Sequence, residues 1–152
     1  MLNLNILVVC TGNTCRSPMA ERLLKEAIKD SGKNIKNYNI YSAGLSTANG
    51  MKASGNSIQI LKENNIDLSD HNSTELIEDL LNKSDLVLTM TRTHKNFLVE
   101  ALPNYANKVY TFRGFAELGE RDISDPFGGD LEIYRNTYNE IKEAVDKIVE
   151  KI

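Results

Sequence analysis

The residues best able to carry out chemistry in this sequence lie in one short stretch near its start, from Cys10 to Pro18. Cys10 follows the apolar run 6–9, and Arg16 comes after an interval of five residues. An ionised cysteine is a nucleophile, and an arginine side chain binds two phosphate oxygens at once. The pair and its spacing indicate nucleophilic chemistry on a bound phosphate group.

The residues between this pair favour a phosphate-binding loop. Gly12 and Asn13 are the types best able to adopt left-handed backbone angles, which can aim successive N–H groups into an anion nest. A helix starting near Ser17 or Pro18 would add unpaired N–H groups and the positive end of its dipole. This positive field favours the thiolate of Cys10, which would lie below the phosphate for in-line attack. The expected phosphate-binding residues are Thr11, Gly12, Asn13, Thr14, Cys15, Arg16 and Ser17.

The elements that must position this loop alternate along the chain. Short apolar or alternating runs predict strands, and apolar residues at helical spacing predict helices. We expect strands at 4–9, 38–43, 85–90 and 108–112, and helices at about 18–30, 58–64, 93–101 and 134–152, with a loop at 120–130. A further helix is expected to have Ser73 or Thr74 as its N-cap and to place Leu76, Ile77, Leu80 and Leu81 on one face.

Such alternation predicts an α/β fold, a single three-layer domain (1–152) with a parallel sheet flanked by helices. Ligands of these sheets bind beyond the carboxyl ends of the strands, at the point where the strand order reverses. Cys10 lies at such a strand end. The fold and the loop therefore point to the same site.

Composition limits the possible partners and compartment. The net charge of −3 argues against a general nucleic-acid surface. No apolar run approaches the ~18 residues of a membrane span, and the first residues lack the pattern of a signal peptide. The two cysteines share one turn, which suits a reducing cytoplasm, and with two distant histidines they fit no zinc site. We expect a cytoplasmic monomer that binds neither nucleic acid nor membrane.

The stretch from Cys10 to Pro18, together with Asp125-Pro126, resembles the low-molecular-weight protein tyrosine phosphatase family. The resemblance extends over essentially the whole chain and includes the segments 42–44 and 85–90 and His71. It implies a four-stranded parallel sheet, a cysteinyl-phosphate intermediate, phosphorylated proteins as substrates, and no metal or cofactor.

The resemblance also implies a role for each site residue. Cys10 would be the nucleophile, Arg16 would stabilise the transition state, and Asp125 would be the general acid and then the general base. Ser17 would donate a hydrogen bond to the sulfur of Cys10. In the family, Cys15 can pair with the nucleophile under oxidation, which would make the site redox-sensitive. The residues expected to brace the loop are Asn13, Ser17, Ser42 and His71.

Simpler interpretations exist for several of these residues. An aspartate before proline is usually a turn former, and Ser17 could cap a helix. Cys15 could be a packed small thiol. His94 matches no family role and is expected on a solvated helix face, whereas the spacing of Tyr134 and Tyr138 places them in the core.

Two rim positions bear on the substrate. Thr14 stands where tyrosine-specific members commonly have isoleucine, and Phe127-Gly128 stands where they commonly have two aromatic residues. One aromatic wall is a weaker partner for a phenyl ring, and a hydroxyl suits a polar guanidinium. Both features resemble the bacterial protein arginine phosphatase branch. We therefore expect phosphoarginine in proteins to be the substrate, with phosphotyrosine as the alternative and Thr14, Phe127 and Gly128 as specificity residues.

Two other classes fit less well. Arsenate reductases share this fold and loop but need further cysteines downstream, and none follows Cys15. A phosphate-binding module without activity would keep Arg16 but would not need Cys10 and Asp125 together. Loss of para-nitrophenyl phosphate hydrolysis in Cys10→Ser would separate an enzyme from a binding module.

Overall fold

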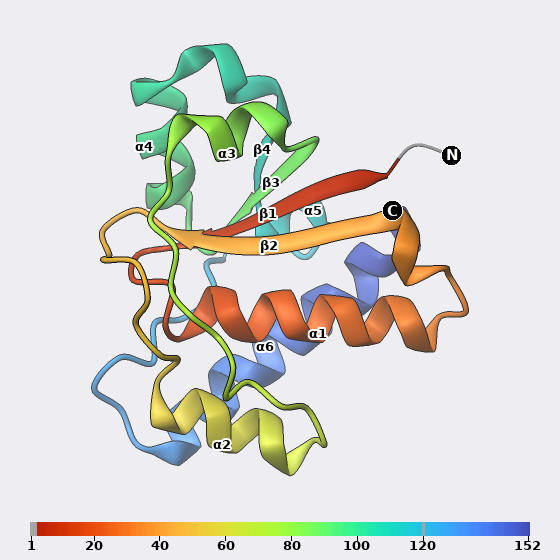
Figure 1. Cartoon of the computed structure of the whole chain (residues 1–152), viewed down its shortest axis with the longest axis vertical. Helices are drawn as coiled ribbons and strands as arrows, with labels where there is room; N and C mark the ends of the chain where they lie inside the picture. The colour runs from red at the N-terminus through yellow and green to blue at the C-terminus, as the bar shows by residue number, and fades with distance from the viewer. Residues whose placement is uncertain (1–2, 120) are drawn as a thin grey trace.

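A computed structural model of the chain describes residues 3–119 and 121–152 and has an α/β architecture (Figure 1). Its strands are β1 (Leu4–Cys10), β2 (Tyr38–Gly44), β3 (Leu86–Thr89) and β4 (Val109–Thr111). They form one parallel sheet in the order β2-β1-β3-β4, in which Cys10 is paired with Gly44 and Val9 with Thr89. The predicted fold class is confirmed, and each of the four predicted strands is present, although β3 and β4 are shorter than predicted.

The helices lie in two layers, one on each face of the sheet (Figure 1). Their bounds are α1 (Arg16–Asp30), α2 (Gly55–Glu63), α3 (Glu78–Lys83), α4 (Arg92–Ala101), α5 (Phe112–Phe115) and α6 (Leu131–Lys151). Two 3₁₀ turns, η1 (Ile35–Asn37) and η2 (Pro103–Lys108), precede β2 and β4. The expected loop at 120–130 begins at a residue outside the described part, and 121–130 contains no helix or strand.

Alternate residues of β1 build two hydrophobic cores. Ile6 and Val8 belong to the core that contains the apolar residues of α1 and α6, among them Tyr134 and Tyr138 as expected. Leu7 and Val9 belong to the core on the other face, with residues of α3 and α4. Burial on both faces explains why this strand is an unbroken apolar run, and it makes the strand a rigid support for the loop that follows it.

The predicted N-cap at Ser73 or Thr74 is wrong. The helix α3 begins at Glu78 and has Ile77, without a side-chain cap, at its N-cap position. The backbone N–H of Thr74 instead donates to Asn13 Oδ1 at 2.8 Å, so tertiary contacts hold this segment extended. Ile77 is also exposed and does not share a buried face with Leu81.

The last strand is shorter than predicted. Phe112 is fully buried and begins α5, so β4 ends at Thr111, whose hydroxyl caps the helix by accepting from the N–H of Gly114. Among the described residues, no helix combines the length and apolar character needed to span a membrane.

Candidate active site

The cysteine loop lies where the strand order reverses. The chain leaves β1 towards α1 on one face of the sheet and leaves β3 towards α4 on the other (Figure 1). Loops that diverge in this way open a crevice at the carboxyl ends of the strands. Cys10 is the last residue of β1 and stands at the floor of this crevice.

A pocket of about 360 Å³ opens above Cys10. One wall is the loop itself, which contributes Cys10, Thr11, Gly12, Thr14, Cys15 and Arg16. The opposite side is formed by the segments after β2 and before α6, which contribute Ser46, Thr47, Met51, Asp125 and Phe127. Of the predicted phosphate-binding residues, only Asn13 and Ser17 do not line the pocket, because both are buried behind it.

The sulfur of Cys10 is buried among hydrogen-bond donors. Cys10 is only 3% exposed. The backbone N–H of Asn13 donates to Cys10 Sγ at 3.2 Å, and Ser17 Oγ lies 2.9 Å from the same sulfur. The helix α1 begins at Arg16, so its positive end also faces this loop. Donors and a positive dipole around a sulfur stabilise the thiolate, which is the nucleophilic form.

Asn13 has the left-handed backbone conformation, with φ of 54°. The same expectation for Gly12 is wrong, since Gly12 is not among the residues with positive φ, and a Cβ there would make ordinary contact with Thr14. A glycine is needed instead at Gly44, where a Cβ would stand 2.8 Å from the carbonyl oxygen of Thr11. The end of β2 therefore packs directly against the loop.

A chain of hydrogen bonds behind the loop ends at the sulfur of Cys10. Ser42 donates to the buried carboxylate of Glu21 at 2.7 Å, and Asn13 Nδ2 donates to Ser42 at 2.9 Å and to Ser17 at 2.8 Å. An ionised carboxylate can only accept hydrogen bonds, so the hydroxyl proton of Ser42 is donated to Glu21. Ser17 accepts from Asn13, and its own proton is left to donate to Cys10.

His71 contacts the same loop from outside. Its Nε2–H donates to the carbonyl oxygen of Asn13 at 2.8 Å, and the imidazole is 5% exposed. Asn13 is thus held at its carbonyl by His71 and at its side chain by Ser17, Ser42 and Thr74. The structure brings together the residues that the sequence singled out for this region.

Arg16 and Asp125 meet at the pocket. Arg16 is 4% exposed and donates from Nη1 to the carbonyl oxygen of Ile123 at 2.9 Å, which fixes its guanidinium. Its Nη2 lies 3.7 Å from Asp125 Oδ2, and the side chain of Asp125 is 57% exposed. Asp125 therefore has a fixed cation on one side and an open pocket on the other.

The rim of the pocket carries one aromatic side chain. Phe127 is 82% exposed, and its backbone N–H donates to Asp125 Oδ1 at 3.1 Å. Gly128 has φ of +81°, a conformation that side chains rarely adopt, and it does not line the pocket. With this backbone a second aromatic residue at that position would be strained. Thr14 is half-buried and lies on the loop side of the pocket.

Sequence reasoning missed or misplaced several residues near the site. His94 is not on a solvated face: it is 7% exposed, and its Nε2 lies 2.9 Å from Thr11 Oγ1. Glu21 lies one helical turn after Ser17. A carboxylate on this otherwise buried face of the helix could have predicted that Glu21 takes part in the buried hydrogen bonds of the site. Tyr134 contributes more than packing, because its hydroxyl lies 3.3 Å from the sulfur of Cys15.

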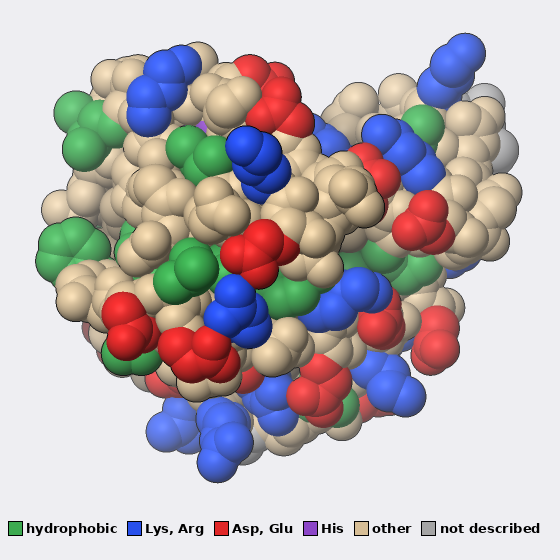
Figure 2. Space-filling view, turned by 90° about the horizontal axis from the view of Figure 1, so that it is seen from below, with side chains coloured by type: hydrophobic (Ala, Val, Ile, Leu, Met, Phe, Trp, Pro, Cys, Tyr) green, Lys and Arg blue, Asp and Glu red, His purple; other side chains and the backbone are tan. Residues whose placement is uncertain are grey.

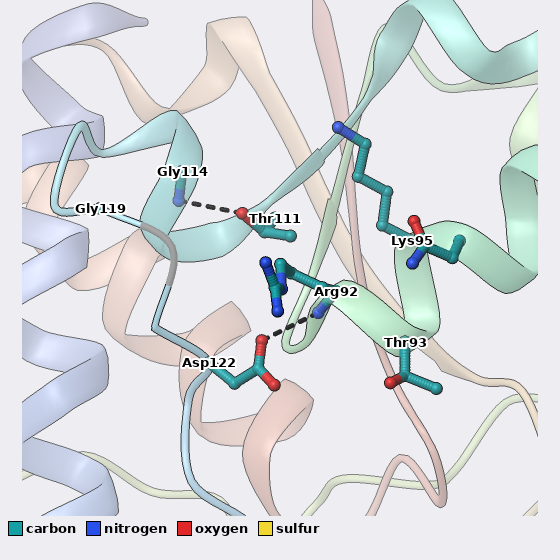
Figure 3. A pocket seen from close by; sticks show the side chains of 8 residues that line it. Arg92, Thr93, Lys95, Thr111, Gly114, Gly119 and Asp122 are labelled. Atoms are coloured by element: carbon teal, nitrogen blue, oxygen red, sulfur yellow. Dashed lines mark hydrogen bonds between the residues drawn. The ribbon is translucent and has the colours of Figure 1, made fainter.

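A second pocket, of about 430 Å³, lies beside the start of α4 (Figure 3). Arg92 and Lys95 project from the helix, and they are faced by Thr111 at the end of β4 and by Asp122 in the segment before α6 (Figure 3). The backbone N–H of Arg92 donates to Asp122 Oδ1 at 2.9 Å, which ties the first turn of α4 to the segment that leads to Asp125. This pocket has no cysteine in its lining.

Among residues 3–119 and 121–152, no group of three or more His, Cys, Asp or Glu side chains could hold a metal ion. A buried thiol within a loop of donors, a fixed arginine and a carboxylate across one pocket define a cysteine-dependent phosphatase.

Comparison with known proteins places the chain within this class. The profile described as "Low molecular weight phosphotyrosine protein phosphatase" matches residues 5–152. The Protein-arginine-phosphatase of Bacillus subtilis is 38% identical over 149 residues, which cover 98% of this chain and 97% of that protein. The chain belongs to the low molecular weight phosphotyrosine protein phosphatase family.

Solved structures agree with this assignment. A low molecular weight protein tyrosine phosphatase from T. tengcongensis superimposes with a TM-score of 0.91 at 42% identity, covering 99% of this chain and 100% of that one. A mutant of the YwlE arginine phosphatase with a phosphorylated active-site serine superimposes with a TM-score of 0.91 at 37% identity, covering 97% and 95%. The relatives therefore include proteins named for each of two substrates.

Proposed function

We propose that this protein removes phosphate from phosphoarginine residues of proteins through a covalent phosphocysteine at Cys10. The observation that carries the choice of substrate is the rim of the pocket, with a hydroxyl at Thr14 and one aromatic side chain at Phe127, followed by Gly128 in a left-handed turn. Phosphotyrosine is the alternative, because a relative at 42% identity is named a tyrosine phosphatase.

In the first step, the thiolate of Cys10 attacks phosphorus in line with the departing guanidino nitrogen. The S–P bond forms while the P–N bond breaks, and the carboxyl group of Asp125 gives its proton to that nitrogen. Arg16 and the N–H groups of residues 11–17 stabilise the charge on the three equatorial oxygens. The proximity of Asp125 to Arg16, at 3.7 Å, supports a carboxyl group placed next to the reacting phosphoryl group.

In the second step, water attacks the phosphocysteine. Asp125, now ionised, takes a proton from that water, the S–P bond breaks, and phosphate leaves while the thiolate is restored. The proton that Ser17 directs at the sulfur favours this departure. The relative with a phosphorylated active-site serine supports a covalent intermediate in the family.

We assign the remaining residues as supports and rim. Asn13, Ser17, Ser42 and His71 brace the loop through the hydrogen bonds described above. Thr14 and Phe127 contact the substrate beyond its phosphoryl group, and Gly128 keeps one side of the pocket open. A flat guanidinium with its aliphatic stem fits a rim that has one aromatic face and one hydroxyl.

We propose further that the chain acts as one domain, as a monomer in the cytoplasm, without a metal or cofactor and without binding nucleic acid or membrane. On the face that Figure 2 shows, Lys and Arg side chains are interspersed with Asp and Glu, which supports the absence of a basic nucleic-acid surface there. Both cysteines are free and buried in one loop, which supports reversible oxidation of Cys10 by pairing with Cys15.

Exchange of the rim residue tests the choice of substrate. Thr14→Ile should shift the ratio of kcat/KM for phosphoarginine over phosphotyrosine peptides towards phosphotyrosine by about tenfold, the scale of discrimination by one small apolar contact. Thr14→Ser, which keeps the hydroxyl, is the matched control and should leave the ratio near its native value. If the native protein and Thr14→Ile have the same ratio of kcat/KM on the two peptides, Thr14 does not determine substrate specificity.

A further inference from the structure

One hydrogen bond joins the cysteine loop to a helix on the other side of the crevice. His94 Nε2 lies 2.9 Å from Thr11 Oγ1, and the imidazole is 7% exposed. Thr11 directly follows Cys10 and lines the active-site pocket. A buried side chain from α4 thus contacts the loop at the residue next to the nucleophile.

The topology explains how this contact arises. β3 is the neighbour of β1, and it leads through Thr91 into the first turn of α4. Thr91 caps the helix by accepting from the N–H of His94 at 3.1 Å, which places the imidazole in the first turn, at the carboxyl edge of the sheet. The two diverging loops of the crevice are therefore bridged by His94.

The same turn also holds the segment that carries Asp125. The N–H of Arg92 donates to Asp122 Oδ1 at 2.9 Å (Figure 3), and the carbonyl of Met90 accepts from the N–H of Ile123 at 3.0 Å. Thr11, which lines the active-site pocket, and Asp122, which lies three residues before Asp125, thus both bind this first turn of α4. This turn of α4 therefore contacts the cysteine loop directly and also the segment that leads to Asp125.

The burial of His94 indicates which form of the imidazole is present. Its Nδ1 is buried and has no hydrogen-bond partner among the described residues. A proton on Nδ1 would be a buried donor without an acceptor, whereas a proton on Nε2 is used by Thr11 Oγ1. Burial first, and the cation of Arg16 second, lower the pKa of His94 to about 4, against the opposing effect of Asp122 and Asp125. His94 is therefore neutral at pH 7.

We propose that His94 is a positioning residue of the phosphatase, which holds Thr11 by donating Nε2–H to its hydroxyl and so fixes the first turn of the phosphate-binding loop. With this donor in place, the proton of Thr11 is free to point to an acceptor in the pocket. His94 contacts the loop at the side chain of Thr11, and we infer that it acts through this residue. The inference rests on the proposed function of the loop.

The position of Thr11 is important because the loop stabilises the phosphoryl charge with backbone N–H groups that must be correctly oriented. The N–H groups after Cys10 must point at the phosphoryl oxygens in the transition state, and preorganised donors are effective because they do not have to reorganise. Thr11 is exposed, in contrast to its buried neighbours Val9 and Cys10. Its backbone carbonyl accepts from the N–H of Ser46 at 2.9 Å, and its side chain is held by the hydrogen bond to His94.

Side-chain replacements at both ends of this bond test the proposal. We would measure kcat/KM with para-nitrophenyl phosphate, and inhibition by inorganic phosphate, for His94→Leu, His94→Gln, Thr11→Val and His94→Leu/Thr11→Val. His94→Leu should lower kcat/KM about tenfold, as expected for a displaced binding group, and weaken inhibition by phosphate. His94→Gln places an amide N–H near the position of Nε2 and should restore both quantities to within about threefold.

The double variant separates positioning from general stability. If one bond carries the effect, Thr11→Val should reproduce the loss of His94→Leu, and the double variant should be no worse than either alone. Losses that multiply in the double variant would overturn the proposal, as would native kcat/KM in both His94→Leu and Thr11→Val, whatever the change in melting temperature.

A Cys10→Ser control keeps this test separate from the proposed function. Turnover that survives Cys10→Ser would contradict the phosphocysteine mechanism itself. A dead Cys10→Ser protein together with fully active His94 and Thr11 variants would overturn the role of His94 alone. Since Thr11 is exposed, Thr11→Val also keeps the test usable if His94→Leu does not fold.

Discussion

The cysteine loop and the Asp125 segment face each other across one pocket but are held very differently. Behind the loop, Asn13, Ser17 and Ser42 are buried in one hydrogen-bonded chain. In the facing segment, the side chain of Asp125 is 57% exposed and Phe127 is 82% exposed. This contrast fits the roles proposed above, in which the buried loop binds the phosphoryl group and the exposed segment contacts the rest of the substrate.

This division has a physical basis. Stabilisation of the phosphoryl charge needs donors fixed to a fraction of an ångström, which buried and mutually hydrogen-bonded groups provide. Discrimination between phosphorylated side chains needs an exposed surface that the side chain of a substrate protein can reach. Changes in the loop should therefore affect every substrate, whereas changes in the facing segment should depend on which substrate is used.

The largest loss of activity should follow from replacement of Cys10, the proposed nucleophile. Cys10→Ser should lower kcat at least about 10⁴-fold on every substrate, because a serine hydroxyl is a far weaker nucleophile at neutral pH. Steady-state turnover of para-nitrophenyl phosphate measures it. An unchanged melting temperature and continued binding of inorganic phosphate would show that the loop is intact, and full turnover would refute the mechanism.

Replacement of Asp125, the proposed general acid, should cause a large loss of activity that depends on the substrate. Asp125→Asn should reduce kcat by about 10²- to 10⁴-fold with phosphoarginine peptides, and less with para-nitrophenyl phosphate, whose leaving group is stable as an anion. Asp130→Asn is the matched control, because it makes the same change near the end of the same segment and keeps an acceptor for the N-cap of α6. Equal losses on both substrates would contradict proton donation by Asp125.

Asn13 tests the rigid side of the comparison. Asn13→Gly removes the side-chain bonds but accepts φ of 54°, whereas Asn13→Ala also adds backbone strain. Asn13→Gly should lower the free energy of unfolding by about 1–3 kcal/mol, and Asn13→Ala should lower it by a further ~1 kcal/mol. Both variants should have a lower kcat on all substrates.

Asn65 offers a control for backbone strain alone. It also has a left-handed conformation, with φ of 62°, and it follows α2, away from the pocket. Asn65→Ala should lower the free energy of unfolding in urea while leaving kcat unchanged. A kcat for Asn13→Ala as high as that of Asn65→Ala would show that the loop does not depend on this network.

The smallest loss of activity should follow from replacement of Phe127, in the exposed segment that faces the loop. Phe127→Ala should lower kcat/KM about three- to tenfold on peptides, through lost contact with the substrate, and should leave the melting temperature unchanged because the ring is exposed. Phe97→Ala, at another exposed aromatic residue, is the control and should change neither quantity. A fall in melting temperature for Phe127→Ala would mean that this wall is part of the packed structure.

The sequence predicted the parts of the site that are local along the chain. The order and spacing of residues suffice to place the apolar run of β1, the loop from Cys10 to Ser17 and the helix after it, because these three parts are contiguous. The long last helix was equally clear, because its apolar residues recur at helical spacing over 134–152.

Two of the errors are at residues whose conformation or burial is decided by contacts that are distant in the sequence. Thr74 does not cap a helix because Asn13, remote in the sequence, accepts its N–H. His94 is buried because β3 lies next to β1 and carries α4 to Thr11, a proximity that helical periodicity does not reveal. Gly12 does not need a left-handed conformation, since Asn13 alone makes the turn.

The most direct test of the account is a comparison of two peptides of identical sequence, one with phosphoarginine and one with phosphotyrosine at the same position. Native protein should release phosphate from the phosphoarginine peptide with the higher kcat/KM, by about tenfold or more, since its pocket has one aromatic wall and a threonine at the rim. A higher kcat/KM for the phosphotyrosine peptide would contradict the proposed substrate and leave a tyrosine phosphatase.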